Sequence, residues 1–155
     1  MSSEEVIIRF NEVTFAYPRL KNILEEASFS VREGAKVTLM GQNGAGKSTL
    51  FKLITKQLQP TDGQIHIKKS MTIAQGLQVV PKEKYEFTVE EFFASAFENP
   101  PSDLERQIEA VLKTVNLTTP LDKKIGHFSG GQQARLLLAY PLIQHPDILL
   151  LDETT

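Results

Sequence analysis

The sequence contains no cysteine, which excludes a disulfide framework and a thiolate metal site and fits a reducing compartment. Positive charge is not in excess, because the net charge is −2 at pH 7, so the chain does not resemble a basic nucleic-acid-binding domain. Long hydrophobic runs are missing too, since no stretch approaches the roughly 18 apolar residues of a membrane span. The acidic N-terminus also lacks the features of a secretory signal. We therefore expect a cytoplasmic protein with no segment inserted in a membrane.

The composition is that of an ordinary globular protein, with 41% hydrophobic and 23% charged residues. Strand-like patterns cover residues 6–17, 27–40, 59–67, 71–80 and 148–151, and a turn at Glu33 and Gly34 divides the second of these into two strands. Helical patterns cover residues 49–58, 88–97, 102–115 and 127–145, the last opening with a glycine-rich turn. Because strands alternate with helices, we expect an α/β fold whose ligands bind at the carboxyl ends of the strands.

The chain shows no repeat, low-complexity tract or linker, so one domain is expected over residues 1–155, with a helical insert at about 88–135. Within that insert, Ser102 and Glu105 have the spacing of a capping box and predict where the third helical segment begins. The apolar residues of this helix share one face. They are Leu104, Ile108, Val111, Leu112 and Val115.

A glycine-rich stretch, GQNGAGKS at 41–48, follows the strand-like AKVTLM and precedes a helical pattern. Glycines at the start of a helix let backbone N–H groups point at phosphate oxygens, where the helix also concentrates positive charge. Lys47 adds a full charge and Ser48 adds a hydroxyl that can ligate Mg²⁺. The spacing G-x-x-x-x-G-K-S, with Gly41 and Gly46 at its glycine positions, therefore predicts a site for nucleotide phosphates instead of an ordinary glycine turn.

Two acids, Asp152 and Glu153, follow the continuous apolar run ILLL, which is typical of a parallel strand buried on both faces. An aspartate there can hold Mg²⁺, and a glutamate beside it can orient or deprotonate an attacking water. Alone, the pair is better explained as an acidic turn after a strand. Together with the lysine loop upstream, it predicts the second half of a phosphate-transfer site.

A second glycine turn, FSGGQQ at 128–133, places Ser129 at the cap position of a helix, followed by Gly130 and Gly131. Taken alone, such a turn is more often structural than functional. Its position shortly before the ILLLDE strand favours a functional role.

The three motifs GQNGAGKS, FSGGQQ and ILLLDE, in this order, resemble the ATPase domain of the ATP-binding cassette (ABC) superfamily. The resemblance implies a P-loop NTPase fold with an N-terminal antiparallel β subdomain, a mostly parallel core sheet and a small helical subdomain. It implies that Lys47 contacts the β and γ phosphates of ATP and that Ser48 and Asp152 serve Mg²⁺. Glu153 would be the catalytic base. The nucleotide-binding loop would comprise Gly41, Gln42, Asn43, Gly44, Ala45, Gly46, Lys47, Ser48 and Thr49.

The FSGGQQ motif resembles the signature of this family, which acts across a head-to-tail pair of ATPase domains. Its residues Ser129, Gly130, Gly131 and Gln132 would cap the γ-phosphate of an ATP bound to the second domain. Tyr17 matches the aromatic residue that stacks on adenine. Gln75 and Gln78 are both candidates for the glutamine that senses Mg²⁺ and water, and Gln78 fits better because it follows the end of a predicted strand.

Within the superfamily, SGGQQARLLLAYPLIQHPDILLLDE looks most like the ABC-F branch of soluble, ribosome-associated proteins. The alternatives are an ATPase subunit docked on a transmembrane transporter subunit and a fragment that binds ATP without hydrolysing it. Two departures affect the expected activity. Thr154 stands where the family usually has proline, and the sequence ends at Thr155, before the next core strand and its histidine. We therefore expect a domain that is incomplete at its C-terminus.

Overall fold

The computed structural model describes residues 5–40 and 46–152. The chain forms two compact units, Met1–Met71 and Thr72–Thr155, and each is described by itself. The N-terminal unit holds strands β1 (Val6–Phe15), β2 (Leu24–Arg32) and β3 (Asp62–Ile67) with helix α1 (Lys47–Ile54). The C-terminal unit holds strands β4 (Ile73–Gln75) and β5 (Ile148–Leu150) and helices α2 (Val89–Ala94), α3 (Leu104–Thr114) and α4 (Gly130–Leu142). It also holds two short 3₁₀ turns, η1 (Lys82–Lys84) and η2 (Ile125–His127).

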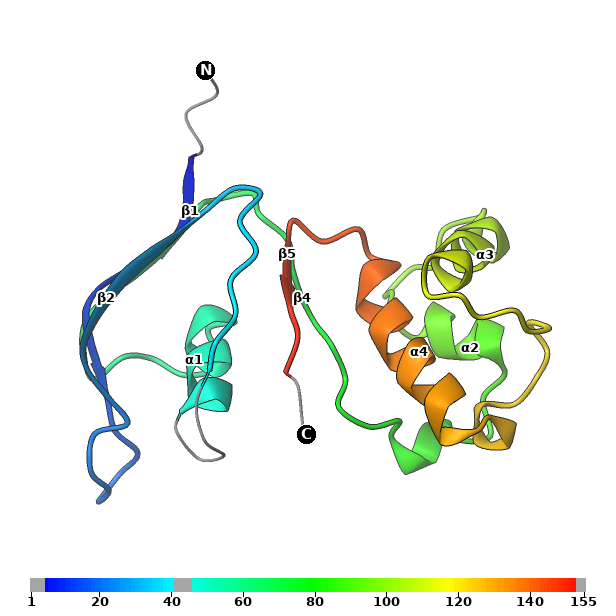
Figure 1. Ribbon diagram of the computed structural model, residues 1–155, viewed down its shortest axis with the longest axis horizontal. Helices are drawn as coiled ribbons and strands as arrows, with labels where there is room; N and C mark the ends of the chain where they lie inside the picture. The colour runs from blue at the N-terminus through cyan, green and yellow to red at the C-terminus, as the bar shows by residue number, and fades with distance from the viewer. Residues whose placement is uncertain (1–4, 41–45, 153–155) are drawn as a thin grey trace. The chain divides into compact units, whose positions relative to one another are not determined.

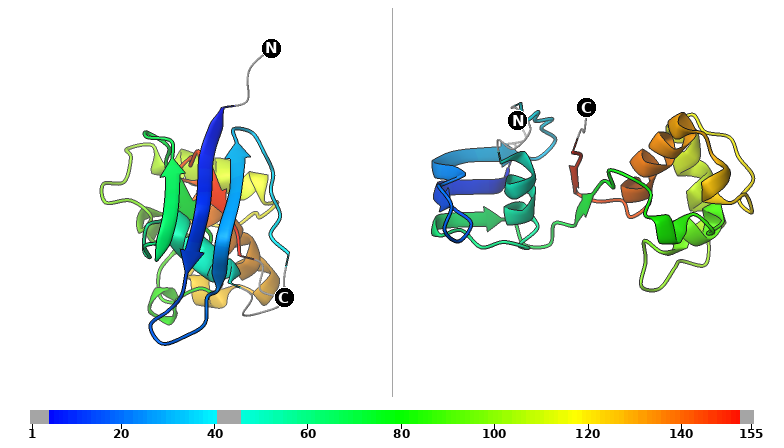
Figure 2. Two further views of the ribbon diagram at one scale, coloured as in Figure 1. Left: turned by 90° about the vertical axis from the view of Figure 1, so that its left-hand side faces the viewer. Right: turned by 90° about the horizontal axis from the view of Figure 1, so that it is seen from below.

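The N-terminal unit is an antiparallel sheet with β1 between β2 and β3, as Figure 2 shows face-on, and α1 lies on one side of it (Figure 1). Apolar residues of β1 are buried, and Phe10 stacks on Phe29 of β2 with ring centroids 4.4 Å apart. Helix α1 buries Leu50, Phe51, Leu53 and Ile54. These aliphatic and aromatic side chains supply the apolar burial that holds the unit together. The predicted antiparallel N-terminal subdomain is confirmed.

The C-terminal unit combines a two-stranded parallel sheet, β4 with β5, and helices α2, α3 and α4 gathered around a shared core (Figure 1). Fully buried residues from all three helices, among them Phe92, Ile108 and Leu136, belong to that core. The predicted apolar face of α3 is confirmed, because all five of its residues are buried. Parallel pairing of β5, predicted from the ILLL run, is also confirmed.

One predicted strand is missing and another is too long. The turn predicted at Glu33 and Gly34 is confirmed, because β2 ends at Arg32 and Gly34 has a positive φ, but residues 35–40, expected to form a strand after it, join no strand. The strand expected over 71–80 is reduced to β4. An alternating pattern becomes a strand only where a neighbour supplies backbone hydrogen bonds. Among the described residues, 35–40 pair with no such neighbour.

The capping box predicted at Ser102 and Glu105 is wrong. Helix α3 begins one residue later, with Asp103 at the N-cap position and no side-chain hydrogen bond to the backbone there. The reason is the preceding turn, in which the Leu104 N–H donates to the carbonyl of Pro101 at 3.2 Å. Because of this turn, the helix begins one residue later than the sequence predicts. Capping boxes form instead at the starts of α2 and α4.

Candidate functional site

Helix α1 begins at Gly46, whose φ of 97° lies in the left-handed region that favours glycine. A Cβ atom at this position would lie 2.5 Å from Cγ2 of Ile23, so space also demands glycine here. The first helical hydrogen bond runs from the Leu50 N–H to the Gly46 carbonyl at 2.9 Å. In the described part of the chain, no side chain caps this start. An uncapped helix N-terminus is the arrangement that phosphate binding requires.

The next three residues differ in exposure: Lys47 is half-buried, Ser48 is exposed and Thr49 is buried. The hydroxyl groups of Thr49 and Tyr17 lie 3.3 Å apart, so Tyr17 stands beside the start of α1. The Tyr17 ring also packs edge-on against Phe15, with ring centroids 5.0 Å apart. The structure thus brings together five predicted nucleotide-binding residues in the N-terminal unit: Tyr17, Gly46, Lys47, Ser48 and Thr49. Stacking of Tyr17 on adenine stays a prediction.

Six of the predicted site residues lie outside the described residues. They are Gly41, Gln42, Asn43, Gly44 and Ala45 of the glycine-rich loop and the predicted catalytic base Glu153. Their roles stay predictions.

In the C-terminal unit, the Gln78 side chain donates from Nε2 to Oδ2 of Asp152 at 2.6 Å. Asp152 follows β5, and Gln78 lies in the loop that follows β4. Because the two strands are parallel neighbours, their carboxyl ends meet at one edge and bring these residues together. Gln75, the other candidate, is the last residue of β4 and pairs with Leu150. The geometry therefore favours Gln78 as the residue that acts with Asp152.

The residues predicted to serve Mg²⁺ fit that ion chemically, because a hydroxyl, an amide oxygen and a carboxylate are hard oxygen donors. Ser48 lies in the N-terminal unit and Asp152 lies in the C-terminal unit, so the contacts of each are described within its own unit. Within the described ranges, no three histidine or acidic residues cluster as a metal site.

The start of α4 is a complete capping box. The Ser129 hydroxyl accepts from the Gln132 N–H at 3.3 Å, and Oε1 of Gln132 accepts from the Ser129 N–H at 3.1 Å. Gly130 and Gly131 are exposed, and an added Cβ would meet no atom within 4 Å at either position. Neither has the positive φ that favours glycine. The fold of this unit therefore gives no local reason for two glycines at this helix start.

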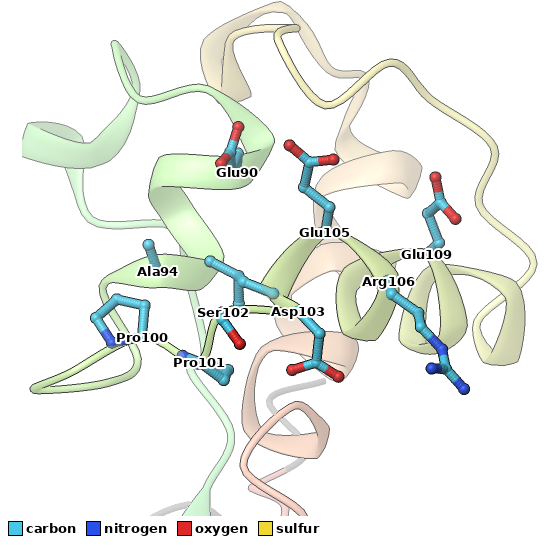
Figure 3. Close-up of a pocket in the computed structure, with 10 residues that line it drawn as sticks. Glu90, Ala94, Pro100, Pro101, Ser102, Asp103, Glu105, Arg106 and Glu109 are labelled. Carbon is cyan, nitrogen blue, oxygen red and sulfur yellow. The ribbon is translucent and has the colours of Figure 1, made fainter.

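A cavity of about 720 Å³ lies between α2, the turn at 100–103 and the first turns of α3 (Figure 3). Its lining includes Glu90, Asp103, Glu105 and Glu109, with Arg106 as its one cation. Four carboxylates disfavour an anionic phosphate, so this cavity is a poor nucleotide site.

None of the helices in residues 5–40 and 46–152 is long and apolar enough to cross a membrane.

The α/β fold, the uncapped start of α1 with its lysine, and the aspartate after a buried parallel strand together define a P-loop ATPase. Residues 24–155 match the family model described as ABC transporter. The chain belongs to this family of ATPases, whose domains bind and hydrolyse ATP.

Two relatives illustrate the match. The chain is 33% identical to the energy-coupling factor transporter ATP-binding protein EcfA of Methanocaldococcus jannaschii, covering 96% of this chain and 59% of the relative. It is also 33% identical to the zinc transport system ATP-binding protein AdcC of Streptococcus pneumoniae, covering 96% and 69%. Among solved structures, cbiO1 from Clostridium perfringens, part of the ABC transporter complex cbiONQ, superposes with a TM-score of 0.81. At 24% identity over 97% of this chain and 66% of that one, it shows the fold.

The chain spans 37%, 29% and 59% of the lengths of three curated relatives that it matches. Both relatives described above are named as ATP-binding proteins of transporters. The ribosome-associated ABC-F branch, expected from the sequence, finds no support in these names. The superfamily prediction is confirmed, whereas the prediction of the branch is not.

Proposed function

We propose that the chain is the nucleotide-binding part of an ABC transporter ATPase, which binds Mg-ATP and hydrolyses it when paired with a second ATPase domain. The observation that carries this proposal is the start of α1, where Gly46 leaves the helix without a side-chain cap and Lys47 follows directly. The transporter assignment rests on the relatives, which are named as transporter ATP-binding proteins. In this proposal, the partners of the chain are the transmembrane subunits of a transporter.

In this proposal, the start of α1 and the Lys47 ammonium group bind the phosphates, and Tyr17 stacks on the adenine ring. Ser48, Gln78 and Asp152 provide the oxygen ligands or outer contacts of Mg²⁺, which neutralises phosphate charge when bound. Glu153 orients or deprotonates the attacking water.

The signature residues 129–132 act on a nucleotide held by the second domain. Two exposed glycines at a helix start, with no steric reason to be glycine, leave room for a phosphate to approach the backbone. In the state described, Ser129 and Gln132 cap each other, and the Ser129 hydroxyl only accepts in this box, so it can still donate to a phosphate oxygen. ATP binding and hydrolysis would then close and open this pair of domains, and this movement is the conformational change that the ATPase drives.

The ABC-F assignment remains the second candidate, carried only by the sequence pattern that includes the Ala134–Arg135 pair. Affinity purification of the full natural protein separates the two candidates. Recovery of a membrane subunit supports the transporter, and recovery of ribosomes supports ABC-F.

The proposed activity is tested by Mg-ATP binding and steady-state hydrolysis, measured on the chain and on its Lys47→Ala and Glu153→Gln variants. We expect Lys47→Ala to lose binding and Glu153→Gln to keep binding and accumulate an ATP-bound dimer. Binding without turnover in every sample would identify a binding-only fragment. Equal ATP binding by the chain and by Lys47→Ala would refute the nucleotide site.

A further inference from the structure

Lys84, the last residue of η1, is partly buried, and its ammonium group is bound by other residues of the C-terminal unit. Its Nζ donates to Oγ of Ser95 at 2.9 Å and to the hydroxyl of Tyr140 at 3.3 Å. It also lies over two aromatic rings, 5.0 Å from the centroid of Tyr140 and 5.7 Å from that of Phe92. A lysine with two hydroxyl acceptors and two ring faces is fixed far more firmly than an ordinary surface lysine.

The acceptors of this lysine are themselves oriented. The Ser95 hydroxyl donates its proton to the carbonyl of Phe92 at 2.6 Å, which leaves lone pairs of Oγ for the ammonium group. Tyr140 comes from α4, whereas Ser95 and Phe92 come from the α2 segment. Lys84 therefore ties η1 to two helices at once, and we call Lys84, Ser95 and Tyr140 the lysine clasp.

The clasp stands at one end of the loop that carries Gln78. At the other end, the Gly76 N–H donates to the carbonyl of Leu150 at 2.9 Å, and a Cβ on Gly76 would lie 3.0 Å from Leu151. Between the two ends, Val80 is buried in the helical core. Gln78 itself is exposed, and its side chain donates to Asp152. Since Gln78 has little packing of its own, its position depends on the anchors of the loop.

We propose that Lys84 is a positioning residue, which holds the loop 76–81 so that Gln78 meets Asp152. This inference rests on the proposed function, in which Gln78 and Asp152 serve Mg²⁺. Lys84 touches neither residue, and it acts through the backbone of η1 and the buried Val80. Loss of the clasp would let the loop sample other positions and weaken the response of ATP binding to Mg²⁺.

The positioning itself is tested by amide hydrogen exchange of residues 76–80 in the nucleotide-free full chain. Lys84→Met keeps the apolar stem and removes the charge and the donors. Its matched control is Lys82→Met, an exposed lysine two residues away on the same turn. We expect exchange to rise about tenfold in Lys84→Met, the loss typical of one charge-assisted hydrogen bond, and to stay unchanged in Lys82→Met. Equal exchange in the two variants overturns the inference, whatever the chain binds.

If Lys84→Met does not fold, Tyr140→Phe removes only one acceptor of the clasp and makes the same measurement possible. A smaller rise in exchange of the same five amides supports the inference. Unchanged exchange in Tyr140→Phe overturns it.

The role in metal response is tested by ATP affinity with and without Mg²⁺. We expect Lys84→Met to lower the Mg²⁺-dependent gain in affinity several-fold while leaving metal-free affinity unchanged, because a merely structural defect would lower both. In a Gln78→Ala background, Lys84→Met should have no further effect on that gain. A full effect in that background refutes the inference. If Mg²⁺ does not raise the ATP affinity of the unsubstituted chain, the proposed function is wrong. The hydrogen-exchange measurement would still decide whether Lys84 positions the loop 76–81.

Discussion

The two glycine-containing helix starts, α1 and α4, solve the same physical problem in opposite ways. Every helix N-terminus leaves backbone N–H groups in need of partners. At α4, side chains supply two of those partners: Ser129 for the Gln132 N–H and Gln132 for the Ser129 N–H. At α1, the N-cap residue Gly46 has no side chain to offer, and its backbone is left-handed. The comparison shows that the start of α4 is capped by its own side chains, whereas the start of α1 has no such cap in the described part of the chain.

Glycine also has a different meaning at the two starts. Gly46 is glycine because its φ and the nearby Ile23 side chain allow nothing larger. Gly130 and Gly131 lie in open space. The fold explains the first glycine, and only an incoming group would explain the other two.

The largest expected effect is on ligand binding at α1. Lys47→Ala should weaken ATP binding by about 100-fold, or about 3 kcal/mol, because it removes a charged donor to phosphate. Isothermal titration calorimetry measures this loss. Lys52→Ala, an exposed lysine of the same helix, is the control and should bind normally. Similar losses in both variants would mean that α1 attracts ATP only by its general charge.

A second experiment compares the glycines by their effect on folding. Gly46→Ala should cost about 2 kcal/mol in free energy of unfolding, since alanine is strained at positive φ and its Cβ meets Ile23. Gly130→Ala should change it by less than about 0.5 kcal/mol, because the position is open. Urea unfolding measures both values. A large cost for Gly130→Ala would contradict the view that this glycine serves a ligand.

The cap of α4 offers a smaller effect with a matched control. Ser129→Ala should cost about 1 kcal/mol of stability, because the Gln132 N–H loses its acceptor. Ser102→Ala should cost less than about 0.5 kcal/mol, because Asp103, and not Ser102, is the N-cap of α3. If urea unfolding gave equal losses of stability for the two variants, Ser102 would act as a helix cap, as the sequence predicted.

The smallest effect concerns the segment before α4, where Nζ of Lys124 lies 2.7 Å from a carboxylate oxygen of Glu86. The hydrogen bond and charge of Lys124 lower the pKa of Glu86, and those of Glu86 raise the pKa of Lys124. The pair therefore stabilises the fold between these two titrations. Its contribution is lost as pH falls through the lowered pKa of Glu86, below its ordinary value of 4.5, or rises above 10.5.

Lys124→Met should thus reduce stability slightly at pH 7, and the difference from the parent chain should vanish at strongly acidic pH. Unfolding in urea across this pH range measures it, with Lys82→Met as the control. A difference that grows on acidification would show that Lys124 acts through another group. Because both side chains are largely exposed, we expect this effect to be the smallest of the four.

Much of the site was predictable from local sequence. The spacing of GQNGAGKS identified the start of α1, because a glycine turn before a helix depends only on neighbours along the chain. The role of its lysine stays a prediction. The buried face of α3 followed from helical periodicity. The start of α3 was not predictable, because the turn made by Pro101 competes with a capping box that looks equally good in sequence.

The sequence by itself determined the superfamily, the start of α1 and the parallel character of β5. Only the tertiary structure decided that Gln78, and not Gln75, meets Asp152, and that Lys84 enters a clasp with Ser95 and Tyr140. The physical reason is separation along the chain. Motifs and periodicity report interactions between neighbours, whereas the pairing of β4 with β5 and the packing of α2 against α4 bring together residues that no spacing rule connects.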